Sequence, residues 1–249
     1  MEGIAPAAQR RPVGRIRKTL AIVFTLAFAV VAALAAGGTY AYLRLPALRA
    51  LPQRVRSQLQ AHGSRWVPLR GVAPSLVKAL LATEDRTFWT NPGVSFEGIA
   101  RSVLVDLASG QFVEGGSTLT QQLVRDELLT QAKTIPRKLE EMVLAIALTR
   151  LDPKREILAL YLNEVYLGHG AYGILAASET YFGRTPAELT LAQSTLLAGL
   201  PQAPSYYDPL IDPKAAAARQ EQVVAAMEQA GDLTPSQGRA VLKAPWGLR

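Results

Sequence analysis

The chain has 249 residues, of which 49% are hydrophobic and 19% charged, and it contains no Cys and two His. The absence of Cys excludes disulfides, iron–sulfur clusters, thiolate zinc sites and cysteine nucleophiles. The two His residues are far apart, so we expect no His-rich metal site and no Ser-His-Asp set. The apolar fraction is high for the charge content, which indicates a membrane segment and enough material for a buried core.

The net charge of +7 is unevenly distributed along the chain. Residues 1–18 carry +4, residues 19–83 carry +7 without a single acid, and residues 84–249 carry −4. A nucleic-acid-binding protein places its basic excess on the folded domain. Here the excess lies in a tail and in the stretch after an apolar segment, which favours anionic lipid headgroups over nucleic acid as the partner.

A membrane anchor is predicted near the N-terminus. No charged residue occurs from Leu20 to Leu43, a run of 24 residues, and about 20 helical residues cross a hydrocarbon core. We expect a basic cytoplasmic tail at 1–18 and a transmembrane helix at 19–43, because Lys and Arg before a span keep that end in the cytoplasm. The alternative is a cleaved signal peptide ending near Ala33-Leu34-Ala35, but the run exceeds the usual core of about 7–15 residues.

Residues 44–73 form a basic segment that contains Pro46, Pro52 and Pro68. We interpret it as a juxtamembrane linker that is partly helical. It either lies along the membrane surface or forms a solvated spacer.

Residues 74–249 read as one all-α domain. Four Thr-Pro or Asp-Pro pairs place a capping residue before a Pro at the first helical position, namely Asp152-Pro153, Thr185-Pro186, Asp212-Pro213 and Thr234-Pro235. Gly110 and Gly231 stand where C-terminal caps belong. We find no strand pattern of period two. The expected helices are 75–88, 96–109, 118–131, 136–149, 153–166, 171–182, 190–199, 213–230 and 235–242.

Glu84 is a candidate general base. It is the first acid after Glu2 and ends an apolar helical stretch, and partial burial raises the pKa of a carboxyl group toward neutrality. Taken alone, an ordinary helix-end charge is the more common explanation of such a residue.

A second candidate is the loop Gly115-Gly116-Ser117-Thr118, which opens a helix that carries Gln121, Gln122 and Arg125. Free backbone N–H groups at a helix start favour an anion such as phosphate. The Gly-Lys-Ser/Thr ending of a Walker loop is absent. The alternative is an ordinary N-cap followed by a polar helix face.

A series of cations follows, comprising Arg125, Lys133, Arg137 and Lys138. Glu141 lies three and four residues after the last two, so these three side chains share a helix face. They are either a solvated ion pair or a diphosphate clamp with a carboxylate beside it. The match of Ser75-Leu76-Val77-Lys78 to the Ser-x-x-Lys of penicillin-recognising enzymes is rejected, because the companion motifs are missing.

Five longer motifs follow one another within residues 74–220. They are Glu84-Asp85-Arg86-Thr87-Phe88 with Gly93; Gly115 through Leu123 with Arg125; Arg137-Lys138 with Glu141 and Ala145; Ile157-Leu158 and Tyr161-Leu162-Asn163 with Tyr166, Gly168 and Tyr181-Phe182-Gly183; and Leu189 through Ser205 with Arg219. In this order and spacing the chain resembles glycosyltransferase family 51, the peptidoglycan glycosyltransferases, in its monofunctional form.

The resemblance implies a lysozyme-like, two-lobed helical domain, with a head and a membrane-facing jaw, that polymerises lipid II into β-1,4-linked glycan strands. It implies that Glu84 deprotonates the acceptor 4-hydroxyl and that Glu141 is the second catalytic carboxylate, on the donor side. Further positions match substrate-binding residues of the family, namely Arg86, Arg101, Ser117, Gln121, Gln122, Arg125, Lys133, Arg137 and Lys138. Tyr161, Leu162 and Asn163 match residues that hold the shape of the cleft.

The chain departs from the family pattern at several positions. The usual His of the first motif is Asn91, and other differences are Ser95, Asp126, Leu148-Thr149 and Gln193. If that His orders the loop around Glu84, the change to Asn91 predicts reduced activity. None of the departures falls on Glu84, Glu141 or the main cations.

The resemblance also implies surroundings for the enzyme. We expect a single-pass protein of the bacterial cytoplasmic membrane, with its catalytic domain outside and lipid II and the growing glycan as substrates. Penicillin-binding proteins or division and elongation proteins are the expected partners, because a transpeptidase domain needs hundreds of residues beyond Arg219. No cofactor is expected to be obligatory, and Mg²⁺ or another divalent cation is compatible with the diphosphate.

The residue types themselves favour transfer over hydrolysis. A lysozyme-type hydrolase must protonate a sugar leaving group and needs a carboxylic acid with a raised pKa. A diphosphate leaves as an anion and needs positive charge, which the cation series supplies. The alternatives are a lysozyme-like glycan-cleaving enzyme and a catalytically weak scaffold that binds lipid II.

Overall fold

The computed structural model describes residues 13–100 and 116–249, with side chains from residue 21 onward. Within these ranges the secondary structure is helical, and the one β-type pairing is an isolated bridge between Tyr166 and Tyr172. The all-α prediction is therefore confirmed for the described residues. The chain divides into two compact units, residues 1–43 and residues 44–249.

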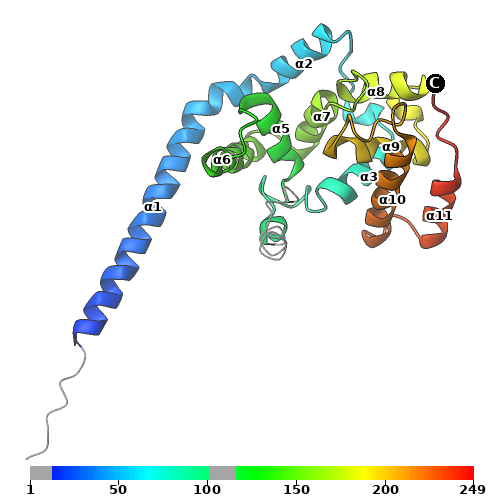
Figure 1. Cartoon of the computed structure of the whole chain (residues 1–249). Coiled ribbons are helices and arrows are strands. Elements are labelled where there is room, and N and C mark those ends of the chain that lie inside the picture. The colour runs from blue at the N-terminus through cyan, green and yellow to red at the C-terminus, as the bar shows by residue number, and fades with distance from the viewer. Residues whose placement is uncertain (1–12, 101–115) are drawn as a thin grey trace, which may run out of the picture. The chain divides into compact units, whose positions relative to one another are not determined.

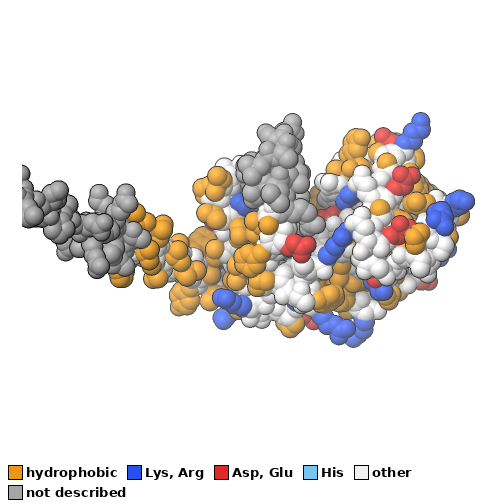
Figure 2. All heavy atoms as spheres, turned by 90° about the horizontal axis from the view of Figure 1, so that it is seen from below, with side chains coloured by type: hydrophobic (Ala, Val, Ile, Leu, Met, Phe, Trp, Pro, Cys, Tyr) orange, Lys and Arg blue, Asp and Glu red, His pale blue; other side chains and the backbone are white. Residues whose placement is uncertain are grey.

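The first unit contains most of α1 (Val13–Arg49), a helix of 37 residues. Its segment Ala21–Arg49 is long and apolar enough to cross a membrane, with a mean hydropathy of 2.3 and none of its most apolar stretch buried. Large side chains such as Phe24, Phe28 and Leu34 are more than 70% exposed, and Figure 2 shows hydrophobic side chains along this part of the helix. The helix fits a membrane anchor and extends beyond the expected 19–43 at both ends.

The segment expected as a linker, residues 44–73, instead contributes to the folded domain. It contains the end of α1, the helix α2 (Leu51–Ala61) and the short turn η1 (Leu69–Gly71). One side of α2 is buried through Leu51, Val55 and Leu59, and the helix packs against α7. The expected boundary at residue 74 therefore falls inside the second unit. The basic composition of this stretch favoured a linker, but its apolar side chains recur with helical spacing and give α2 a face that packs on the domain.

The second unit contains α2 and eight further α-helices among the residues that the structure describes. They are α3 (Pro74–Glu84), α5 (Leu119–Leu128), α6 (Ile135–Leu151), α7 (Lys154–Glu164), α8 (Gly173–Phe182), α9 (Leu191–Gly199), α10 (Pro213–Gln229) and α11 (Pro235–Lys243), with the short turns η2 (Pro186–Glu188) and η3 (Leu200–Gln202). Helices α3, α9 and α10 pack together on one side, and α5 packs against α6 and α7 on the other (Figure 1). The cleft described below lies between these two groups.

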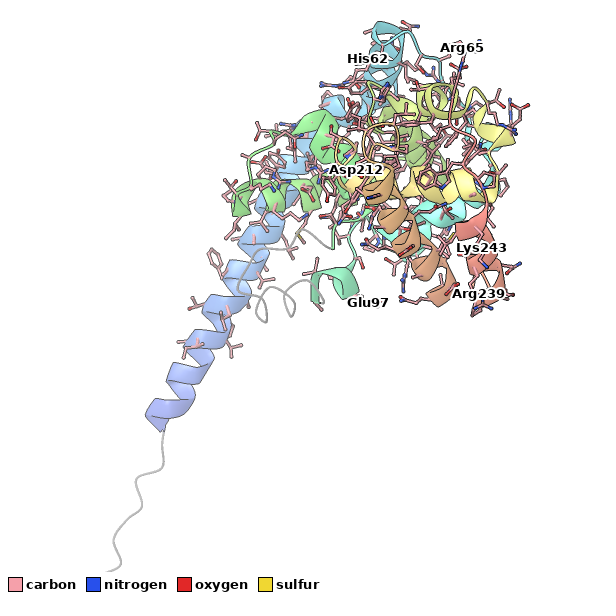
Figure 3. The ribbon with its side chains drawn as sticks, turned by 45° about the vertical axis from the view of Figure 1, so that its right-hand side comes forward. His62, Arg65, Glu97, Asp212, Arg239 and Lys243 are labelled. Carbon is pink, nitrogen blue, oxygen red and sulfur yellow. The ribbon has the colours of Figure 1, made fainter. Side chains whose placement is uncertain are left out.

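Polar caps fix most of the helix starts. Thr118, Thr134, Thr190 and Thr234 each accept a hydrogen bond from the backbone N–H three residues later, and Asp212 caps the start of α10 (Figure 3). Such a cap contributes about 1 kcal/mol. The expectation for Asp152-Pro153 is wrong, because Asp152 ends α6 and the next helix begins at Lys154 without a side-chain cap.

The helix expected at 75–88 ends early, at Glu84. Asp85 leaves the helical conformation, with φ −155° and ψ 79°, and its carboxylate accepts hydrogen bonds from residues outside the helix. Of the helix expected at 96–109, residues 96–100 are helical, and the remainder, with the cap expected at Gly110, lies outside the described residues.

The packing of α2 generates a prediction about stability. Leu59 is 2% exposed and lies so close to α8 that a Cβ on Gly173 would be 3.1 Å from its Cδ2 atom. We expect Leu59→Ala to lower the free energy of unfolding by about 2–5 kcal/mol, the usual result of emptying a filled core position. Thermal unfolding of the detergent-solubilised chain measures this. Ser57→Ala, on the exposed side of the same helix, is the control and should leave unfolding unchanged.

Candidate active site

The candidate site is a cavity of about 320 Å³ where the end of α3 meets the start of α5. Glu84 lies in its wall, at the last position of α3. The opposite wall includes Ser117 and Gln122 from the start of α5, and Arg219 comes from α10. Glu97, on the helical turn at 96–100, also lines the cavity (Figure 3). Two helices far from Glu84 in the sequence, α5 and α10, thus reach its carboxylate.

Two side chains hold the Glu84 carboxylate. Gln122 Nε2 donates a hydrogen bond to Oε2 at 3.0 Å, and the Arg219 guanidinium donates to Oε1 at 3.2 Å. The Glu84 side chain is 14% exposed and that of Arg219 is 9% exposed. Arg219 is fixed in turn by a bond to the Gly199 carbonyl at 3.0 Å and lies over the Tyr207 ring. The Glu84 carboxylate therefore has a defined orientation and remains open to the cavity.

Burial raises the pKa of Glu84 above its ordinary value of 4.5. The hydrogen bond from Gln122 and the positive charges of Arg219 and Arg125 oppose this rise, and the neighbouring Asp85 adds to it. Removal of water from a carboxylate disfavours its charged form. A raised pKa brings a carboxyl group closer to neutral pH, which suits general-base catalysis.

Glu141 forms a second, more deeply buried carboxylate on α6. It is 0% exposed and contacts Arg137 and Lys138 one turn earlier on the same helix. Gln121 Nε2 donates to its Oε1 at 3.0 Å. Lys138 Nζ also donates to the Ser117 hydroxyl, so the cluster reaches the cavity wall. The predicted shared face of these three α6 residues is confirmed: Glu141 is buried, while Lys138 keeps 39% of its side chain exposed.

Helix α5 connects the two carboxylates through adjacent glutamines. Gln122 contacts Glu84, and Gln121 contacts Glu141. The Gln121 side chain also completes the capping box of this helix, since its Oε1 accepts the Thr118 N–H at 3.1 Å. Because this amide serves the helix cap and the carboxylate together, the start of α5 and Glu141 are held in one arrangement.

The protein's own Asp85 occupies part of the predicted anion site at the start of α5. Its Oδ2 accepts the Leu119 N–H at 3.2 Å, and both carboxylate oxygens accept from Asn91 Nδ2. Asn91 Oδ1 accepts from Lys154 Nζ at 2.8 Å and from the Gly93 N–H at 3.0 Å. Asn91 thus orders the loop after Glu84 through both ends of its amide, and the reduced activity expected from its replacement of His stays a prediction.

The remaining predicted residues lie around this site in different ways. Arg86 lines the cavity and bonds to the Ala82 carbonyl and to Gln229. The Arg125 guanidinium pairs with the neighbouring Asp126, while its charge acts on Glu84. Lys133 is exposed in the segment between α5 and α6. Arg101 lies outside the described residues.

The described side chains form no cluster that could hold a resident metal ion. No group of three His, Asp or Glu residues in this part of the chain is arranged to hold one. We therefore derive no step through a protein-bound metal, and a divalent cation on the substrate diphosphate stays a prediction.

Arg219 is the residue of the site that sequence reasoning placed least well. It was identified only as part of the fifth motif, yet it contacts Glu84 across 135 positions in sequence. The long separation gives no local signal, because helix packing rather than spacing brings α10 to α3. Asp85 was likewise quoted only as a motif residue, although it joins the loop to α5.

Comparison with known proteins now identifies the family. The family model described as "Transglycosylase" matches residues 52–228, which is most of the chain. The chain belongs to the transglycosylase family. An all-helical, lysozyme-like domain agrees with this membership, and the match begins within α2, consistent with the packing of that helix in the second unit.

Several relatives share substantial identity with this transglycosylase domain. Penicillin-binding protein 1A of Escherichia coli is 45% identical over 171 residues, covering 69% of this chain and 20% of the relative. Penicillin-binding protein 1A of Aquifex aeolicus is 41% identical over 180 residues, covering 72% and 25%. A crystal structure of Penicillin-Binding Protein 1A from Haemophilus influenzae aligns with 25% identity and a TM-score of 0.44, over 74% of this chain and 18% of that one. The chain thus spans about a quarter or less of these proteins.

The raised pKa of Glu84 generates a prediction about stability. Because the folded state binds this proton more tightly than the unfolded state, the ionised carboxylate opposes folding above the ordinary pKa of 4.5. We expect Glu84→Gln to raise the melting temperature at pH 7, and this gain should vanish as the pH falls to about 4, where both states of the wild type are protonated. Glu179→Gln, an exposed change on α8, is the control. An equal effect at both pH values would contradict the assignment.

Proposed function

We propose that this protein is a peptidoglycan glycosyltransferase that polymerises lipid II into β-1,4-linked glycan strands and releases the lipid diphosphate. The observation that carries the proposal is that one helix, α5, holds two unlike carboxylates from two other helices: Glu84 of α3 faces a cavity, and Glu141 of α6 is buried beside two cations. Membership of the transglycosylase family supports the same reaction class.

Glu84 acts as the general base in this reaction. It accepts the proton of the acceptor 4-hydroxyl as that oxygen forms a bond to the anomeric carbon of the donor sugar. The bond from the same carbon to the diphosphate oxygen breaks, and the electron pair leaves with the diphosphate. Gln122 and Arg219 orient the carboxylate for this step, and a positioned base contributes about 10²–10⁴-fold.

The cluster around Glu141 supplies the charge that the leaving group requires. Arg137 and Lys138 carry two positive charges against one carboxylate, so the cluster retains a net positive charge beside Ser117 in the cavity wall. Preorganised positive charge stabilises a developing anion without further rearrangement. Glu141 acts on the donor side by holding both cations in place.

Two alternatives predict different products. A lysozyme-like hydrolase would cleave finished glycan, and a scaffold would bind lipid II without turnover. The cation cluster favours a diphosphate leaving group over a sugar, and the hydrogen bonds of Asn91 support a loop that is ordered for catalysis. Incubation of the purified protein with lipid II, with and without Mg²⁺, followed by sizing of the products, separates these possibilities.

The apolar helix places the enzyme beside its substrate. A lipid-borne donor and an anchored enzyme share one plane, which raises their effective concentration. We propose a single-pass protein of the bacterial cytoplasmic membrane, with the N-terminus in the cytoplasm and the catalytic domain outside, that acts with penicillin-binding proteins or division and elongation proteins.

The role of Glu84 is tested by replacing its carboxylate with an amide of the same shape. We expect Glu84→Gln to reduce lipid II polymerisation by about 10²–10⁴-fold, because no other group at that position accepts the proton. The measurement is the rate of glycan formation from lipid II by the full chain in detergent or liposomes. Glu179→Gln should retain wild-type activity, and turnover by Glu84→Gln near the wild-type rate would refute the base assignment.

The role of the cation cluster is tested at Lys138. Lys138→Met keeps the length of the side chain and removes its charge, so we expect kcat to fall by about 10²-fold through loss of stabilisation of the leaving diphosphate. Lys243→Met, at an exposed position of α11 (Figure 3), is the matched control. A change in KM with an unchanged kcat would show that Lys138 acts in ground-state binding alone.

A further inference from the structure

We propose that Tyr161 is a positioning residue for the general base, because its buried hydroxyl holds the Gln122 amide with its N–H group toward Glu84. Tyr161 lies on α7, and two successive hydrogen bonds connect its hydroxyl to the Glu84 carboxylate. The inference rests on the proposed function in so far as Glu84 is the base of the reaction.

The geometry forms a continuous chain of hydrogen bonds. Tyr161 is 1% exposed, and its hydroxyl donates to Gln122 Oε1 at 3.0 Å. Gln122 Nε2 then donates to Glu84 Oε2 at 3.0 Å. Each end of the Gln122 amide therefore has one partner, and the two partners lie on different helices, α7 and α3.

This arrangement selects one of two amide orientations. If the Gln122 amide rotated by half a turn, its oxygen would face the Glu84 carboxylate, and two acceptors without a proton between them repel each other. Burial and the nearby negative charge of Glu84 hold the pKa of Tyr161 well above its usual value. The hydroxyl is therefore a lasting donor, and the orientation that accepts from it is the one that presents Nε2 to Glu84.

The selection matters most when Glu84 is protonated. A protonated Glu84 carboxyl can donate a hydrogen bond to an amide oxygen. The rotated Gln122 would accept this bond and so stabilise the protonated form of Glu84, which the base must leave before the next reaction. Tyr161 opposes this rotation and favours return to the ionised form. The role differs from that of a residue that only fills the core.

Other charges also act on Glu84, and Tyr161→Phe changes none of them. Arg219 faces it from α10 and Arg125 from α5, both favouring the ionised form, and Asp85 lies beside it with the opposite effect. Glu164, Asp126 and Arg125 also act electrostatically on the Tyr161 hydroxyl. Removal of the hydroxyl leaves all of these charges in place.

Tyr161→Phe in the full chain is the decisive variant, with Tyr181→Phe as its control. Tyr181 is 0% exposed and its hydroxyl donates a buried hydrogen bond to the Leu167 carbonyl at 2.9 Å, so this change also removes a buried hydroxyl and its hydrogen bond. We expect Tyr161→Phe to move the acidic limb of kcat/KM to higher pH by roughly 0.5–1 unit and to lower kcat about threefold to tenfold, with KM unchanged. Tyr181→Phe should keep the wild-type pH profile.

Direct titration of the Glu84 carboxyl by carbon NMR gives a reading that does not need activity. The pKa of Glu84 should rise in Tyr161→Phe and stay at the wild-type value in Tyr181→Phe. Gln122→Met, which removes the same N–H donor at a partly exposed position, should produce a similar rise, and adding Tyr161→Phe to it should produce no further rise.

The outcomes separate the two proposals. An unchanged pKa of Glu84 in folded Tyr161→Phe or folded Gln122→Met overturns the positioning role, as does a full additional shift in the double variant. A shifted pKa in a protein whose wild type does not polymerise lipid II supports the positioning role and overturns the proposed function.

Discussion

The structure depends on the way helix α5 holds two carboxylates with two neighbouring amides. Gln122 donates to Glu84 and Gln121 donates to Glu141. Adjacent residues on a helix point about 100° apart, so these amides reach α3 on one side and α6 on the other. Helix α5 therefore links the two carboxylates through its own side chains. Any movement of α5 would change the environment of both acids together.

The two carboxylates differ because their neighbours differ. Glu84 has one guanidinium and one amide, keeps 14% of its side chain exposed and has a raised pKa. Glu141 is fully buried but contacts Arg137 and Lys138, and a buried carboxylate is tolerated when it is paired and hydrogen-bonded. The first arrangement leaves a basic oxygen that faces the cavity. The second uses the carboxylate to fix cations, so one residue type performs two different tasks.

Local sequence patterns predicted much of this fold and part of the site. Capping residues located the starts of α5, α10 and α11, and helical spacing placed Glu141 beside Lys138. The end of α3 was predicted four residues too late, because Asp85 leaves the helix to bond with Asn91 and Leu119. The contact of Arg219 with Glu84 and the packing of α2 on α7 join distant segments. Such contacts depend on tertiary packing, which no local periodicity encodes.

Two arginines of residues 44–54 support the C-terminal end of helix α5. The last carbonyl groups of a helix lack partners within it. In α5, two of them accept hydrogen bonds from arginines that follow the apolar run. Arg44 donates to the Leu128 carbonyl at 2.8 Å, and Arg54 donates to the Glu127 carbonyl at 2.9 Å. Cations at a helix C-terminus also interact favourably with its dipole. Asp85 meets the positive start of α5 and these arginines meet its negative end. Part of the basic excess after the apolar run therefore has a structural use, because it fixes the helix that contacts both carboxylates.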